Sequence, residues 1–318
     1  MKTVVQQLML SLLAAAAFAR PAAAEVRSVF AYRLSDSTGD LPLNWAALNG
    51  DPIAGELYVI DSSGGSVDVF NDNGMQVFAF GDDSNLGAVM GVAALPGGDL
   101  AVLAQKPAGW SLVRCNFRGE PRSEIAVHGM PADFGAFSPG TLRLSGFKLY
   151  LADKGAMKVI AVGFDGAVTG AWNIPALLKL DAKKALGADM RGFNVDRAGN
   201  LLGTIPGLFL ALVITPEGEV RSFGVRGSSA GKFNVVAGIA ADESGNIFVA
   251  DTLKCAVLVF DKDLKFIDQL GYRGEDDEEG LIAPQEIAVA QGRLYVSQSR
   301  GGVKAFDFLL NETPGDHK

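Results

Sequence analysis

Residues 224–251 read GVRGSSAGKFNVVAGIAADESGNIFVAD. Two short apolar runs, 236–241 and 247–250, flank the turn Asp242-Glu-Ser-Gly245 in this stretch. Short apolar and β-branched runs separated by Gly, Asp and Asn are typical of paired β-strands. The stretch therefore predicts an antiparallel hairpin, and the run 257–260 predicts a third strand directly after it.

The second strand of this hairpin recurs along the whole chain. The six copies place Leu or Ile at positions 57, 100, 149, 201, 247 and 294, which are 43 to 52 residues apart. A period of about 40–50 residues with several short strands in each unit is typical of propeller blades. We expect an all-β chain that forms a six-bladed β-propeller of four-stranded antiparallel blades.

The two ends of the chain predict how the ring closes. The last copy stops after its third strand, near residues 306–309, and lacks a fourth. Residues 26–34 form a spare strand-like segment with no partner in their own repeat. Pairing the two segments would complete the last blade and remove two open sheet edges, which otherwise invite aggregation.

Two consecutive copies resemble the NHL repeat. The first combines Gly224-Val-Arg-Gly227 and Gly238-Ile-Ala-Ala-Asp242 with the strand that ends at Asp251, and the second combines Gly271-Tyr-Arg-Gly274 with Pro284-Gln-Glu-Ile-Ala-Val289. The resemblance covers roughly residues 26–308, although the first four copies are degenerate. It implies an NHL-type propeller of the exported bacterial kind, a family that binds partners more often than it catalyses reactions.

Residues 1–24 have the pattern of a signal peptide. Lys2 is followed by the apolar run 8–18 and by the small residues Ala22-Ala-Ala24, as at a cleavage site. A membrane anchor is the alternative, but the run is shorter than the ~20 residues that cross a bilayer. We expect a signal peptide at 1–24, the propeller at 25–310 and a short C-terminal tail at 311–318. The mature chain would be periplasmic or extracellular.

The overall charge of the chain indicates which classes of partner to expect. The net charge is −8, and contacts to phosphates dominate the affinity of proteins for nucleic acids. We therefore expect no nucleic-acid partner, and no segment after the signal peptide is apolar and long enough to span a membrane. A protein or a small ligand is the expected partner, and the oligomeric state stays open.

The innermost strand of each blade carries the candidate residues of the central channel. Alternate side chains of a strand point to the same side. Aligning the copies gives a channel lined mostly by Gly and Ala, with five polar exceptions: Asn44, Thr141, Arg143, Asn194 and Glu286. Blades 3 and 6 face each other in a six-fold ring, so Arg143 and Glu286 are expected to meet. The pair would be either a structural ion pair or part of a site for a small ligand.

A divalent-metal-dependent hydrolase, similar to a lactonase or esterase, is the alternative function. Propellers similar to gluconolactonases hold a divalent cation at the channel mouth with Glu, Asn and Asp side chains. That resemblance would make Glu286, Asn44 and Asn194 calcium ligands, but no Asp fits and Arg143 would repel the cation. The 2 histidines are too few for a zinc-dependent lyase. We expect no catalytic residue and no cofactor, with calcium as the alternative.

One face of the propeller is expected to carry the loops between blades and the loops after each Asp-ending strand. Its most unusual segment is an acidic run of five consecutive carboxylates: Glu275, Asp276, Asp277, Glu278 and Glu279. These carboxylates either attract a basic partner or form a solvated loop without one. The sequence favours a non-catalytic binding or scaffold module that uses this face.

Overall fold

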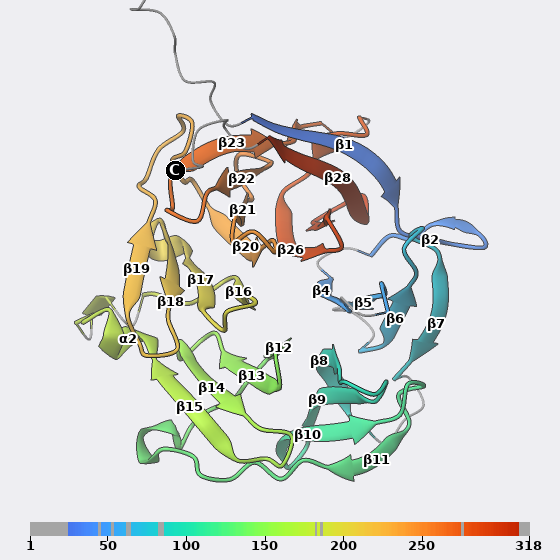
Figure 1. Cartoon of the computed structure of the whole chain (residues 1–318), viewed down its shortest axis with the longest axis vertical. Coiled ribbons are helices and arrows are strands. Elements are labelled where there is room, and N and C mark those ends of the chain that lie inside the picture. The colour runs from blue at the N-terminus through green and yellow to red at the C-terminus, as the bar shows by residue number, and fades with distance from the viewer. Residues whose placement is uncertain are drawn as a thin grey trace, which may run out of the picture.

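The computed structural model describes residues 25–311 except 44–45, 52–53, 62–64, 82–85, 182, 185–186 and 275–276. The predicted signal peptide and the predicted tail beyond residue 311 lie outside the described residues. Six four-stranded antiparallel sheets form in this part of the chain. They stand around a common axis as the blades of a propeller (Figure 1), which confirms the predicted fold.

Each blade runs outward from the axis in the order of the sequence. From the innermost strand outward, the first three blades are β4 (Ala47–Gly50), β5 (Leu57–Ile60), β6 (Val67–Phe70) and β7 (Gln76–Phe80); β8 (Ala88–Ala94), β9 (Leu100–Lys106), β10 (Gly109–Cys115) and β11 (Pro121–Glu124); β12 (Thr141–Ser145), β13 (Lys148–Asp153), β14 (Lys158–Val162) and β15 (Val168–Asn173). The next two are β16 (Phe193–Val195), β17 (Leu201–Ile205), β18 (Leu210–Ile214) and β19 (Val220–Phe223); β20 (Val236–Ala241), β21 (Ile247–Asp251), β22 (Ala256–Phe260) and β23 (Phe266–Leu270).

The sixth blade joins the two ends of the chain. It consists of β26 (Pro284–Ala290), β27 (Arg293–Gln298), β28 (Val303–Asn311) and, outermost, β1 (Glu25–Arg33). β1 pairs with β28 in antiparallel register from Glu25 opposite Asn311 to Arg33 opposite Lys304. The blue first strand therefore lies beside the red last strand (Figure 1), as the unpaired ends of the sequence predicted.

Short elements decorate the loops between the strands. They are β2 (Ser35–Asp36), β3 (Gly39–Asp40), β24 (Tyr272–Arg273), β25 (Gly280–Leu281), the 3₁₀ turns η1 (Ala132–Phe134) and η2 (Pro206–Leu208), and the short helix α2 (Ile174–Leu177). None of them interrupts a blade.

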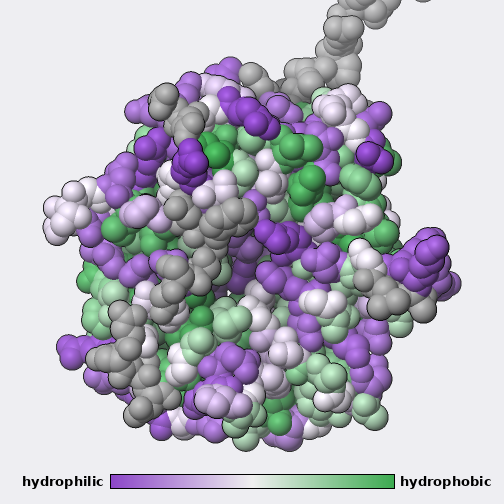
Figure 2. Space-filling model, turned by 180° about the vertical axis from the view of Figure 1, so that it is seen from behind, coloured by the Kyte–Doolittle hydropathy of each residue, from purple (hydrophilic) through white to green (hydrophobic). Residues whose placement is uncertain are grey.

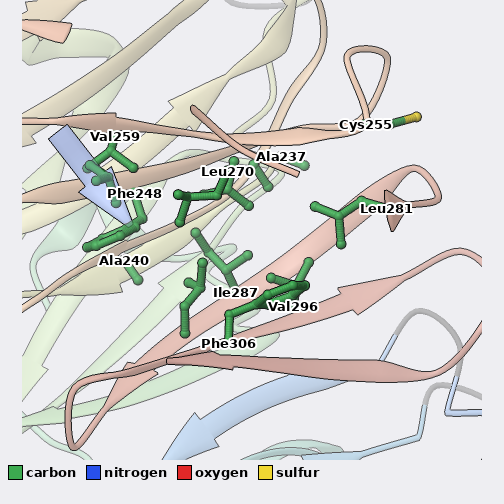
Figure 3. Close-up of a cluster of buried hydrophobic side chains, with 14 residues drawn as sticks. Ala237, Ala240, Phe248, Cys255, Val259, Leu270, Leu281, Ile287, Val296 and Phe306 are labelled. Atoms are coloured by element: carbon green, nitrogen blue, oxygen red, sulfur yellow. The ribbon is translucent and has the colours of Figure 1, made fainter. Parts of the chain in front are cut away.

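The hydrophobic core is divided among the blade interfaces. Each of the six clusters of buried side chains joins two neighbouring blades. Between blades 5 and 6, Phe248, Ile287 and Phe306 pack against one another (Figure 3). Because strands buried on both faces cannot alternate with polar residues, this arrangement explains the nearly continuous apolar second and third strands of each copy.

Glycines let the innermost strands approach one another around the axis. A Cβ added at Gly238 would lie 2.7 Å from the amide nitrogen of Ile287 in the next blade, and one at Gly91 would lie 2.7 Å from the Cβ of Leu142. Real Cβ atoms do not tolerate such contacts. The repeated Gly of the innermost strand is therefore required by close packing at the centre of the ring.

Candidate functional site

Strand pairing fixes which residues share a level along the axis. Arg143 pairs with Tyr150 and Asn194 pairs with Leu202, and these partners occupy the same position in the second strands of their blades. In blade 1 the equivalent residue Tyr58 pairs with Asn49. Asn49 is thus the polar residue of blade 1 at this level, which alignment of the sequence did not predict, while Asn44 lies outside the described residues.

Arg143 and Glu286 meet across the centre of the propeller, as their positions in blades 3 and 6 predicted. Nη2 of Arg143 donates to Oε1 of Glu286 at 2.7 Å, and Nη1 donates to the carbonyl oxygen of Leu142 at 3.1 Å. The two side chains are 7% and 15% exposed. Burial lowers the pKa of the Arg143 guanidinium, and the Glu286 carboxylate raises it. Thr141, on the same strand, is also buried.

The sequence did not single out two further cations near this pair, Lys154 and Arg191. Nη2 of Arg191 donates to Oε1 of Gln285 at 2.8 Å, and the amide of Met190 donates to the Lys154 carbonyl oxygen at 3.0 Å. Burial lowers the pKa of the Lys154 ammonium, Glu286 raises it, and Arg143 and Arg191 lower it further. Hydrophilic atoms gather around the hollow at the centre of the molecule (Figure 2).

A cavity of about 680 Å³ opens beneath the ion pair and includes Arg143 and Asn194 in its lining. Its volume is within the usual range for small-molecule sites. The cavity extends along the innermost strands to the turns that connect them to the second strands. Those turns supply Ser145, Asp196, Arg197, Asp242, Glu243, Ser244 and Gln291 to the lining. Of the two members of the ion pair, Arg143 lines the cavity and Glu286 does not.

The two asparagines at the level of Arg143 hold neighbouring blades together. Nδ2 of Asn194 donates to the Ile239 carbonyl oxygen at 3.2 Å, and its Oδ1 accepts from the Val195 amide at 2.8 Å. Nδ2 of Asn49 donates to the carbonyl oxygen of Val92. Both amides therefore bond to backbone groups of innermost strands, and the Asn194 oxygen is already occupied.

Two of the three candidate calcium ligands are already engaged by other groups, and the third, Asn44, lies outside the described residues. Calcium takes 6–8 oxygen ligands, whereas Glu286 is paired with Arg143 and the oxygen of Asn194 accepts a backbone amide. Within the described part of the chain, three or more His, Cys, Asp or Glu side chains do not gather anywhere as a metal-binding group. Arg143 occupies the space next to the one carboxylate that a cation would need.

The acidic run lies in the loop between blades 5 and 6. Asp277, Glu278 and Glu279 are exposed, while Glu275 and Asp276 lie outside the described residues. Beneath the loop, the buried Nζ of Lys304 donates to the carbonyl oxygens of Asp277, Glu278 and Gly280 at 2.8, 3.2 and 2.6 Å. Burial lowers the pKa of Lys304 to about 8, with a further lowering by Arg33.

An apolar pocket of about 430 Å³ adjoins this acidic loop. Gly274 and Leu281, which flank the run in the sequence, both line the pocket. Val235, Leu253, Cys255 and Ile282 add apolar surface, and Arg273 completes the rim. Leu253 is 55% exposed and Val235 is 42% exposed, which is unusual for apolar residues placed so close together.

Aspartates at the ends of the second strands fix the loops on this side of the molecule. The carboxylate of Asp251 accepts backbone N–H groups of Asn234, Val235, Leu253 and Lys254 at 2.6 to 3.2 Å. Asp153 accepts those of Ser138 and Ala156, both at 2.9 Å. These buried carboxylates have a structural role, and this explains why the copies 148–153 and 246–251 end in Asp.

Among the described residues, no helix has the length and apolar composition needed to cross a membrane.

No protein-family model and no curated protein matches the chain. The likeness to the NHL repeat therefore stays a prediction from the sequence.

Solved structures of other proteins share the fold. A virginiamycin B lyase from Staphylococcus aureus has a TM-score of 0.58 at 13% identity, with 91% of this chain and 100% of that chain covered. A putative gluconolactonase has a TM-score of 0.57 at 16% identity, with 92% and 94% covered. A chain of a nidogen–laminin complex has a TM-score of 0.50 at 15% identity, with 79% and 84% covered. At these identities the likeness establishes the propeller fold, which hosts both enzymes and binding proteins.

Proposed function

We propose that this chain is an exported, non-catalytic binding module that holds a protein partner on the face formed by the acidic loop and the apolar pocket. The observation that carries the proposal is that Gly274 and Leu281, on either side of the acidic loop in the sequence, both line the apolar pocket. An exposed apolar surface rimmed by charge is typical of protein interaction sites.

The chemistry of the surface defines the partner. Three exposed carboxylates in sequence, Asp277–Glu279, attract Lys and Arg side chains and speed association with a basic partner. The pocket beside them accepts an apolar side chain, with Leu253 and Val235 at its edge. A segment that carries an apolar anchor next to basic residues complements both features.

The described part of the loop, Asp277 to Gly280, is anchored by the rest of the chain without a partner. Lys304 fixes three of its backbone carbonyl groups, and the hydroxyl of Tyr272 donates to the Asp277 carboxylate. A surface that is already ordered loses less conformational entropy on binding. The propeller in a nidogen–laminin complex supports the proposal as a fold that works within a protein assembly.

The test is a selection of displayed random peptides on the purified chain. We expect the enriched peptides to combine Lys or Arg with a Leu, Ile or Phe anchor. Their affinity should fall about tenfold or more in Leu253→Asp, and by a similar factor in the triple variant Asp277→Asn, Glu278→Gln, Glu279→Gln.

The matched control is Glu124→Gln, which removes an exposed carboxylate from β11 in blade 2. It should leave the affinity of the same peptides unchanged. Peptides without basic residues, or peptides that bind Leu253→Asp as tightly as the unaltered chain, would overturn the proposal.

A further inference from the structure

The central cavity has opposite charges at its two ends. At the inner end, Arg143 lines the cavity and is paired with Glu286. Lys154 and Arg191 do not line the cavity but lie close to Glu286. At the outer end, three carboxylates, Asp196, Asp242 and Glu243, line the cavity together with one cation, Arg197. In an acidic protein of net charge −8, the buried Arg143 is a local positive charge at a position where water screens charges weakly, whereas Glu243 and Arg197 at the outer end are exposed.

The Arg143 guanidinium has N–H donors that make no hydrogen bond with the described residues. A guanidinium carries five N–H groups, and within the described part of the chain Arg143 makes two hydrogen bonds, to Glu286 and to the Leu142 carbonyl. The Arg143 side chain is only 7% exposed, and the residue lines the cavity. The remaining N–H groups therefore need an acceptor, either water or a ligand in the cavity.

We propose that the central cavity binds a small zwitterion with a carboxylate at one end and a cationic group at the other, such as an amino acid or short peptide. The carboxylate lies at the inner end and accepts from Arg143, and the cationic group faces Asp242 and Glu243 at the outer end.

The charge of the surroundings supports this orientation. A ligand carboxylate in the cavity would give the Arg143 guanidinium a second anionic partner besides Glu286 and would stabilise its charged form. A dianion without a cationic end would be repelled by the outer carboxylates. The cavity of about 680 Å³ has room for a dipeptide.

The site differs from the partner-binding face in every residue. Apart from the shared propeller, the two proposals depend on different loops, and Leu253→Asp leaves the cavity lining intact. Loss of peptide binding at the acidic loop would therefore leave this proposal standing, and the reverse holds as well.

The test is calorimetric titration of the purified chain with free amino acids and with a panel of dipeptides, glycyl-leucine among them. We expect at least one probe to bind with a Kd below about 1 mM. Its C-terminal amide should bind at least about tenfold more weakly, because a charge-assisted bond to Arg143 is lost. Its N-acetyl form lacks the cationic end and should bind about threefold more weakly. This loss is smaller than that of the amide because the outer carboxylates are more exposed to water than Arg143.

Variants locate the bound molecule. Arg143→Gln should abolish binding, and the double variant Asp242→Asn, Glu243→Gln should weaken binding of the free dipeptide without affecting its N-acetyl form. Arg118→Gln is the matched control, because it removes an exposed arginine that does not line the cavity and should not change binding. Urea midpoints verify that each variant is folded.

Three results would overturn the proposal: no probe binds at about 1 mM, the amide binds as well as the free acid, or folded Arg143→Gln binds like the unaltered chain.

Discussion

Two buried charges, Asp251 and Arg143, are treated differently by the fold. Asp251 is fully buried and accepts four backbone N–H groups. Arg143 is also buried, but it makes only two hydrogen bonds with the described residues, and it borders a cavity. A charge that the backbone satisfies completely holds the architecture together. A charge that keeps unused donors next to a cavity is available for binding.

The largest expected effect concerns Asp251, the buried charge whose hydrogen bonds hold the architecture together. Asp251→Ala leaves four amide groups without their acceptor, so we expect the free energy of unfolding to fall by about 3–5 kcal/mol. Asp153→Ala removes the acceptor of two amides and should lower it by about 2 kcal/mol. Urea denaturation measures both. Equal losses would contradict the idea that the number of satisfied amides determines the contribution.

The ion pair between Arg143 and Glu286 tests the other buried charge, Arg143. Arg143→Met leaves Glu286 unpaired, and Glu286→Leu leaves Arg143 unpaired, so each should lower the free energy of unfolding by about 2–3 kcal/mol. The double variant should return to within about 1 kcal/mol of the unaltered chain, since desolvation of both charges is then avoided. A double variant as unstable as the sum of the singles would show that the pair stabilises the ring by itself.

A third buried charge, Lys304, gives a pH-dependent effect. Its pKa is about 8 in the folded chain and has an ordinary value of 10.5. Between these values the unfolded chain holds a proton that the folded chain has released, so the Lys304 contribution to stability rises with pH. Relative to Lys304→Met, the unaltered chain should gain at most about 1.4 kcal/mol per pH unit in this window. Urea midpoints measured at several pH values give this difference. A difference between the two urea midpoints that decreases or stays constant as the pH rises would refute this prediction.

The smallest expected effect is on metal binding. Because Arg143 occupies the Glu286 carboxylate, calorimetric titration with calcium should give no heat beyond dilution, both for the unaltered chain and for Glu286→Gln. Tight calcium binding that disappears in Glu286→Gln would instead favour the hydrolase alternative and justify a screen of lactones and esters.

The sequence predicted the parts of the molecule that follow the repeat. The six copies, the closure by residues 26–34 and the meeting of Arg143 with Glu286 all depend on position within a regular strand, and the period specifies that position. In blade 1 the innermost strand β4 is short and begins at Ala47, later than the alignment assumed. The alignment therefore missed Asn49.

The rest of the site lies outside the period. Lys154 and Arg191 occupy loops whose lengths differ among blades, so alignment of the copies cannot place them opposite Glu286. Two signals were present: a lysine directly after the strand-terminal Asp153, and an arginine directly before Gly192. Likewise, Lys304 lies in the apolar strand 303–306, where a charged residue indicates a specific buried partner.

The pairing of β1 with β28 has a consequence for the order of folding. β1 can pair only after β28 has been synthesised, because the two strands are separated by nearly the whole chain. Such non-local contacts form slowly. Blades 1 to 5 can each assemble from adjacent residues, but the last interfaces form only when β1 has paired with β28. The rate-limiting event is therefore expected to be a single late docking step, and deletion of β1 should act mainly on that step.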